Sequence, residues 1–303
     1  MTDMWLVCEG RTDRPILEHI FTRVLPTGIL IKSGGGCEAI PSVAAYLAQE
    51  NAGTVATAFV VDRDYARRDV VEAAFNDGKR RFRWRRHSIE NYLLEPAVVV
   101  HALTSMINTT PSSKRYLLGS VPNDEATIAM ELRTCAQARA PQEAGRMAYY
   151  RLWEDISDPA GRIDNGLPTV LSQGSPNVAA CRQALIAEVT RMIQKANETA
   201  ACMYLAPLAI QQRYDDELAR ITAGGYMSQS CFLEEFHGRD LLGAVHARLN
   251  ETYKMRLSRK TFTEALRDAV HVVYSANRLL YGTDDFLDLA NGVRALAQMP
   301  PLT

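Results

Sequence analysis

The sequence contains no run of about 18 consecutive apolar residues, the length that a membrane-spanning helix requires. Its first residues lack the basic segment and long apolar stretch of a signal peptide, so we expect a cytoplasmic protein without membrane contact. Net charge is also small, because 34 Lys and Arg face 35 Asp and Glu. Any nucleic-acid partner must therefore be held by a local basic patch.

No CxxC or Cys/His spacing typical of a zinc site is present, and the six cysteines are widely dispersed. This pattern predicts buried, reduced thiols. Hydrophobic residues make up 47 % of the 303 residues, enough for a substantial core in one or two domains.

The first hundred residues alternate between strand-like and helix-like patterns. Apolar strand patterns occupy 4–8, 28–31 and 55–61, with helical periodicity at 12–24 and 39–49 between them. Such alternation predicts an α/β fold with a mostly parallel sheet flanked by helices. We expect an α/β core at 1–96, a mainly helical region at 97–225, and a C-terminal helical segment at 226–303 that packs back on the core.

Acidic side chains follow two of these predicted strands. Glu9 and Asp13 come after the first strand, and Asp62 and Asp64 directly follow the third. The carboxyl ends of parallel strands meet at one sheet edge, where open α/β sheets bind ligands. Carboxylates crowded there repel one another unless a cation lies between them. Because hard cations prefer oxygen ligands, the pattern predicts a Mg²⁺ or Mn²⁺ site and phosphate chemistry.

Each acid taken singly has a simpler explanation. Asp13 could cap a helix or complement its dipole. Asp62 and Asp64 could be turn residues, and Glu9 could pair with a nearby arginine. The joint pattern is more specific than any of its members.

A fourth polar element, Ser88-Ile89-Glu90, follows another strand-like segment. Side chains two residues apart on an extended segment point the same way, so Ser88 and Glu90 could offer a hydroxyl and a carboxylate to one cation. The alternative is a helix N-terminus, with Ser88 as the N-cap and the acid in the first turn.

The segment 79–86 is strongly basic, and its arginines alternate with Phe82 and Trp84. Alternating arginine and aromatic residues can contact the backbone and bases of nucleic acid. The other interpretation is an edge strand whose charges discourage aggregation. The candidate nucleic-acid contacts are Arg63, Lys79, Arg80, Arg81, Arg83, Arg85 and Arg86.

Three motifs together resemble the TOPRIM domain of topoisomerases, primases and OLD-type nucleases: Glu9-Gly10-Arg11-Thr12-Asp13, Asp62-Arg63-Asp64 and Ser88-Ile89-Glu90. The first and third are most similar to the OLD-type branch. Residues 87–94 and, more weakly, 236–242 are similar to stand-alone TOPRIM proteins encoded beside ABC-type ATPases, such as the effector subunit of PARIS-type anti-phage systems. The resemblance covers residues 4–95 well and 231–250 weakly.

The resemblance implies a TOPRIM-like sheet with a large helical insertion and a C-terminal helical region. It also implies oxygen ligands for one cation or two, namely Glu9, Asp13, Asp62, Asp64, Ser88 and Glu90. The implied catalytic set is Glu9, Asp62, Asp64, Glu90 and a basic residue that steadies charge on phosphate. OLD-type nucleases use a lysine there; Arg239 is our candidate in this sequence, with Lys254 and Lys260 as rivals.

The expected function is a metal-dependent endonuclease that hydrolyses DNA or RNA, transfer RNA included. By resemblance it is the toxic effector of an anti-phage system, a homodimer controlled by an ABC-type ATPase. The main alternative is an inactive TOPRIM-like module that binds nucleic acid or the ATPase. A phosphatase with an Asp-x-Asp nucleophile is disfavoured, because such enzymes carry the pair after the first strand, where this chain has Glu9.

Overall fold

The computed structural model describes residues 4–21, 29–36, 39–50, 56–65, 81–156, 168–173, 177–198, 206–276 and 285–296. The chain divides into two compact units, and each is treated by itself. Unit 1 contains residues 1–129 and 238–303, and unit 2 contains residues 130–237. The candidate site lies in unit 1.

A parallel sheet of four strands forms the centre of unit 1 within the described residues. The strands are β1 (Met4–Cys8), β2 (Ile29–Ser33), β3 (Ala56–Val61) and β4 (Arg81–Arg83), in the order β2-β1-β3-β4. Cys8 pairs with Ser33 on one side and Val60 on the other, and Val61 pairs with Arg83. The strands therefore end together, as the predicted parallel α/β sheet requires.

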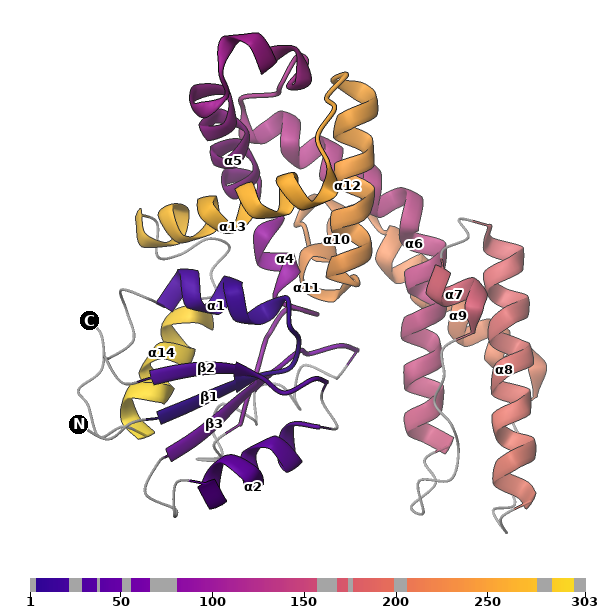
Figure 1. The fold of residues 1–303 in the computed structure, drawn as a ribbon. Coiled ribbons are helices and arrows are strands. Elements are labelled where there is room, and N and C mark those ends of the chain that lie inside the picture. The colour runs from indigo at the N-terminus through magenta and orange to yellow at the C-terminus, as the bar shows by residue number, and fades with distance from the viewer. Residues whose placement is uncertain are drawn as a thin grey trace. The chain divides into compact units, whose positions relative to one another are not determined.

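Helices α1 (Asp13–Phe21) and α2 (Ile40–Glu50) cover opposite faces of the sheet (Figure 1). Successive residues of a strand point to opposite faces. Val7 and Val61 accordingly pack with Ile40 and Leu47 of α2. Leu6 lies on the other face, which α1 covers, and is fully buried. The short loops that follow β1 and β3 lie at the open carboxyl edge of the sheet.

The other helices of unit 1 are α4 (Glu90–Leu93), α5 (Pro96–Thr109), η1 (Ser112–Leu117), α12 (Gly238–Thr252), α13 (Arg259–Ala276) and α14 (Asp285–Leu296), and α6 (Glu125–Ile156) begins there. Helix α13 packs against both α5 and α1, and α12 packs against α4. Figure 1 shows α13 crossing beside α1. Residues late in the chain are thus brought beside the sheet edge.

Unit 2 consists of helices in its described residues. After most of α6 come α7 (Thr169–Gln173), α8 (Val178–Glu198), α9 (Pro207–Thr222), α10 (Gly224–Ser228) and α11 (Phe232–Glu235). Helix α8 packs on α9, with Leu185, Val189, Ile210 and Tyr214 buried.

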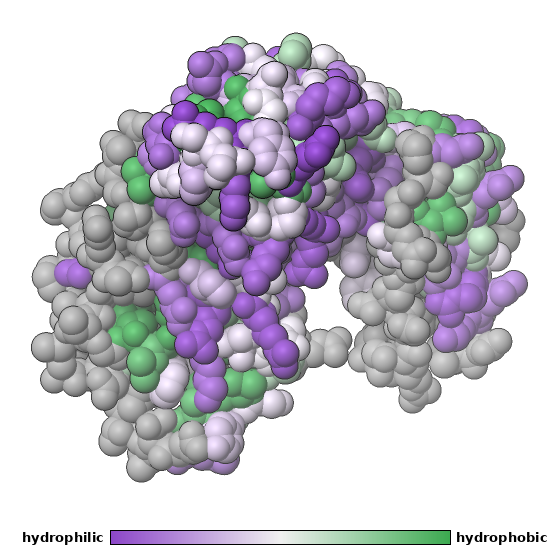
Figure 2. Space-filling view, turned by 45° about the horizontal axis from the view of Figure 1, so that its top comes forward, coloured by the Kyte–Doolittle hydropathy of each residue, from purple (hydrophilic) through white to green (hydrophobic). Residues whose placement is uncertain are grey.

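No helix in the described ranges is both long and apolar enough to cross a membrane. Figure 2 shows hydrophilic side chains across the middle of unit 1 on the face in view. Among the described cysteines, Cys8, Cys135 and Cys181 are buried, as their dispersed spacing predicted, whereas Cys231 is half-buried.

Candidate active site

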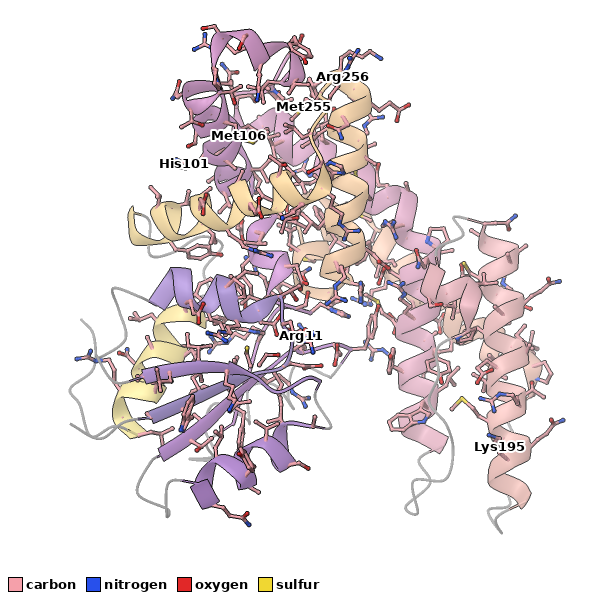
Figure 3. All side chains as sticks on the ribbon, in the orientation of Figure 1. Arg11, His101, Met106, Lys195, Met255 and Arg256 are labelled. Atoms are coloured by element: carbon pink, nitrogen blue, oxygen red, sulfur yellow. The ribbon has the colours of Figure 1, made fainter. Side chains whose placement is uncertain are left out.

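Glu9 and Asp62 meet at the carboxyl edge of the sheet. They follow the adjacent strands β1 and β3, and the backbone N–H of Asp62 donates to Oε2 of Glu9 at 3.2 Å. The partner of Arg14 is Glu18, at 2.7 Å, and not Glu9. The exposed Arg11 lies near the ends of the strands (Figure 3).

Asp13 faces back over the turn that leads into α1. One carboxylate oxygen accepts the Gly10 N–H at 2.6 Å, and the other accepts the Thr12 hydroxyl at 3.2 Å. A Cβ at Gly10 would meet Asp13 Oδ1 at 2.9 Å, so the turn favours glycine. Burial raises the pKa of Asp13, the Gly10 bond lowers it, and the charge of Glu90 raises it again. Asp13 therefore lies at the start of a helix, as the simpler explanation predicts, and it also lies close to the other acids.

Asp62 has the most strained electrostatic environment of the predicted acids. Its Oδ1 is buried and finds no hydrogen-bond donor among the described residues. Burial raises the pKa of Asp62 well above its usual value, and four neighbouring carboxylates raise it further: Asp13, Glu90, Glu9 and Asp64. These acids come from separate segments, and the fold brings them within electrostatic reach of one another.

Asp64 lies at the rim of this group. Its backbone is in the left-handed region (φ 49°), and its N–H donates to the His87 carbonyl at 2.9 Å. Although the residue is exposed overall, partial desolvation of its carboxylate raises its pKa to about 6. The charge of Glu9 raises this pKa too, and Arg83 lowers it. The Asp62–Asp64 pair thus has one inner member and one outer member.

Ser88 and Glu90 lie where α4 begins. The Ser88 hydroxyl donates to Oδ1 of Asn91 at 2.9 Å, and no side chain caps the helix at Ile89. Ser88 therefore does not act as the N-cap, which was the simpler interpretation. Glu90 is buried in the first turn, and its charge acts on both Asp62 and Asp13.

Arg239 reaches the site from the start of α12. Its Nε lies 3.5 Å from Oε1 of Glu90, and its side chain is 61 % exposed. Of the two rivals, Lys260 lines the same cavity as Glu90 and Arg239. Lys254 follows the far end of α12, a 15-residue helix about 22 Å long.

The donor set of this cluster consists of oxygens, which suit Mg²⁺ or Mn²⁺ better than zinc. The unpartnered Oδ1 of Asp62 fits such an ion. In the described part of the chain, however, no three His, Cys, Asp or Glu side chains are arranged as a group that could hold a metal. Asp13 is turned toward Gly10, and Glu90 toward Arg239.

Several arginines expected to contact nucleic acid have structural partners. Arg63 is buried and donates to the Arg85 carbonyl at 2.8 Å. Arg86 is buried, pairs with Glu95 and donates to the Asn91 carbonyl at 3.1 Å. Arg85 pairs with Asp285 and, at 2.7 Å, with Asp288 of α14.

Arg83, a further expected contact, lies close to the acidic cluster. It is half-buried on β4, with its charge acting on Asp64. Lys79 and Arg80 lie outside the described residues, and the side chain of Arg81 does too.

The aromatic residues of this segment face the interior. Phe82 is buried against α14, where a Cβ at Gly292 would meet its ring at 2.2 Å. Trp84 is buried with its ring centroid 5.4 Å from those of Tyr92 and Phe286. Their alternation with arginine reflects a half-buried strand, and neither ring is a stacking surface for bases.

The glycine run after β2 forms a turn onto β1. The N–H groups of Gly34, Gly35 and Gly36 donate to the carbonyls of Cys8 and Glu9 at 2.7, 3.1 and 2.9 Å. Because these donors are used within the protein, the run buttresses Glu9. It does not offer the donors a phosphate cradle needs.

The chain matches no known protein-family model, and no curated protein is similar to it. The site must therefore be assessed on its own geometry. Beyond the predicted residues, the structure adds Thr12, Arg259 and Arg267, which line a cavity with Glu90 and Arg239. Thr12 belongs to the Glu9–Asp13 motif, whereas Arg259 and Arg267 carry no motif, and the basic character of 254–260 hinted only at Arg259.

Proposed function

We propose that this protein is a divalent-metal-dependent nuclease with a TOPRIM-like catalytic core. The observation that carries the proposal is the environment of Asp62, whose buried Oδ1 has no partner among the described residues and whose pKa is raised by burial and four other acids. Such an arrangement is unfavourable unless positive charge joins it. Clusters of this kind mark functional sites.

The roles follow from the resemblance. Glu9, Asp13 and Glu90 hold one cation, and Asp62 and Asp64 hold a second or share the first. When bound, such cations activate a water molecule and stabilise the leaving oxygen of a phosphodiester. Arg239 offsets negative charge on the transferring phosphoryl group. Ser88 adds a hydroxyl beside Glu90.

Three carboxylates of the proposed site each accept a hydrogen bond from within the protein. Like charges separate, and each takes a nearby hydrogen-bond donor: Glu9 the Asp62 N–H, Asp13 the Gly10 N–H, and Glu90 the Arg239 guanidinium.

The resemblance also bears on the biological role of the proposed nuclease. It supports a toxic effector of an anti-phage system, controlled by an ABC-type ATPase and acting in the cytoplasm as a homodimer. Either RNA or DNA is a suitable substrate for the site, and transfer RNA is the first RNA to test.

The direct test is incubation of the purified full chain with a panel of DNA and RNA, transfer RNA included, in Mn²⁺ or Mg²⁺, with and without an ATPase encoded beside it. Wild type should cut, and Glu9→Gln and Asp62→Asn should not. Glu251→Gln is the matched control, because Glu251 is exposed near the end of α12. Equal cutting by wild type and both site variants would refute the assignment.

A second candidate is an inactive module that binds nucleic acid or an ATPase. It is favoured by the absence, in the described residues, of three acids arranged to hold a metal. The two candidates separate on cation binding. The inactive module binds no Mn²⁺ at millimolar concentration, whereas the nuclease does.

A further inference from the structure

A cavity of about 380 Å³ opens next to the carboxylates in unit 1. It lies between α1, α4, α12 and α13, and shares Glu90 and Arg239 with the candidate active site. Its size is that of small-ligand sites, which begin at roughly 300 Å³. The lining residues are Thr12, Ile16, Glu90, Leu93, Arg239, Leu242, Arg259, Lys260, Thr263, Glu264 and Arg267.

Positive charge predominates around this cavity, with four basic residues against two acidic ones. The acids neutralise little of it: Lys260 lies 4.0 Å from Glu264, and Arg239 lies 3.5 Å from Glu90. The Lys260–Glu264 pair is exposed and contributes little at this separation, and Arg239 itself is largely exposed.

Two arginines of α13 have charges that remain available to bind an anion. Arg259 donates to the backbone carbonyl of Arg239 at 2.7 Å, and Nε of Arg267 is buried without a hydrogen-bond partner. Neither forms an ion pair with a carboxylate among the described residues. A buried donor without a partner is unfavourable, and a phosphate oxygen would satisfy it.

The inner wall of the cavity is apolar. Ile16, Leu93 and Leu242 are buried within the protein, and their side chains border the space. The cavity therefore combines an apolar wall with several cationic donors. A nucleotide matches this combination, because its base and sugar are flat and partly apolar while its phosphate is anionic.

We propose that this cavity is a subsite for one nucleotide of the substrate strand, next to the scissile phosphate. Arg259 and Arg267 bind the adjoining phosphate, and the base and sugar occupy the cavity that Ile16, Leu242 and Thr263 line. The proposal rests on the nuclease function, since the cavity shares Glu90 and Arg239 with the cutting site. It assigns the recognition of the strand to α12 and α13, beyond the predicted basic segment.

Binding without metal tests the subsite separately from cutting. The full chain in EDTA is titrated into fluorescein-labelled single-stranded 12-mers of RNA and DNA, and anisotropy is recorded. Arg267→Ala should weaken binding about tenfold or more, as expected for a charge-assisted bond to phosphate. Thr263→Trp, which fills the cavity and keeps every charge, should weaken binding similarly.

Arg115→Ala and Lys114→Ala are the matched controls, because both residues are exposed on η1 outside the cavity. They should bind like wild type. Thermal unfolding of each variant identifies any that fails to fold, and Arg267→Lys, which retains the charge, should recover part of the affinity.

Competition with AMP distinguishes a strand subsite from a site for a free nucleotide. AMP should displace the 12-mer from wild type and bind more weakly to Arg267→Ala. AMP binding that leaves the 12-mer in place would overturn the proposal, as would wild-type affinity for the 12-mer in folded Arg267→Ala and Thr263→Trp. Loss of cutting in every condition, with these binding differences intact, would instead refute the nuclease function alone.

Discussion

The Nε atom of Arg239 lies 3.5 Å from Oε1 of Glu90, although 149 positions separate them in sequence. The contact depends on close approach of α12 to α4. A Cβ at Gly238 would meet Oδ1 of Asn91 at 2.2 Å and Oγ of Ser88 at 2.4 Å. Glycine at this position therefore lets Arg239 reach the carboxylate.

Gly238→Ala should move the start of α12 away from α4 and destabilise the protein by about 1–3 kcal/mol, as expected for overpacking. Cleavage should fall as well, because Arg239 loses its place. Denaturant unfolding and cleavage rates measure the two effects. Gly224→Ala is the control, since nothing lies within 4 Å of its added Cβ. A stable, fully active Gly238→Ala would contradict the proposed contact.

Arg239→Ala should lower the cleavage rate by about 10²-fold or more, the loss typical when one donor to developing charge is removed. Lys254→Gln should leave the rate unchanged, because Lys254 lies beyond the far end of α12. Single-turnover cleavage with saturating enzyme separates this effect from binding. The reverse ranking would assign the role to Lys254.

The metal-free protein should become more stable as the pH falls from 7.5 to 5.5. The pKa of Asp64 is about 6 in the folded chain against an ordinary value of 3.8, and that of Asp62 is also raised. A carboxyl group with a raised pKa in the folded state stabilises it below the unfolded value, and this contribution is lost as pH rises through the folded value.

The unfolding temperature in EDTA reports this dependence. Asp62→Asn should unfold at a higher temperature than wild type at pH 7.5, with a smaller change on acidification. Added Mg²⁺ should raise the wild-type value at pH 7.5 more than that of the variant. A wild-type pH dependence unchanged in Asp62→Asn would show that the acids are not coupled.

Arg83→Ala and Arg85→Ala should act differently, although both lie in the basic segment. Arg85→Ala leaves Asp285 buried with Tyr92 and the Arg85 N–H as its remaining partners among the described residues. The loss should be roughly 3 kcal/mol, the lower end for breaking a buried ion pair. Arg83→Ala should mainly weaken nucleic-acid binding and lower its salt dependence.

Denaturant unfolding and binding at two salt concentrations distinguish these outcomes, with Arg115→Ala as an exposed control. If Arg83→Ala left the salt slope unchanged, β4, which lies at the edge of the described sheet, would have no role in binding.

Local patterns of the sequence predicted the sheet core well. Strand β1 coincides with the predicted 4–8, β3 lies within the predicted 55–61, and α2 is shifted by one residue from the predicted 39–49. Hydrophobic periodicity determines such elements directly. The acids after β1 and β3 are likewise brought to one edge, because parallel strands end together.

Side-chain partners were not predictable in the same way. Arg63 and Arg86 look like surface cations in the sequence, and they are buried because Glu95 and backbone carbonyls receive them. Local sequence patterns could not predict the cavity either, because Arg259 and Arg267 are brought beside α1 and α4 only by tertiary packing. The pattern of charged residues in a sequence does not specify which helix or strand will bury each charged side chain.

Titration of Mn²⁺ into the full chain, with free Mn²⁺ measured by electron paramagnetic resonance, tests the central claim most directly. Wild type and Glu251→Gln should bind Mn²⁺ at millimolar concentration or below, whereas Asp62→Asn and Glu9→Gln should bind it much more weakly. If wild type leaves all the Mn²⁺ free, or if all four proteins bind it equally, the carboxylates at the sheet edge do not form a metal site.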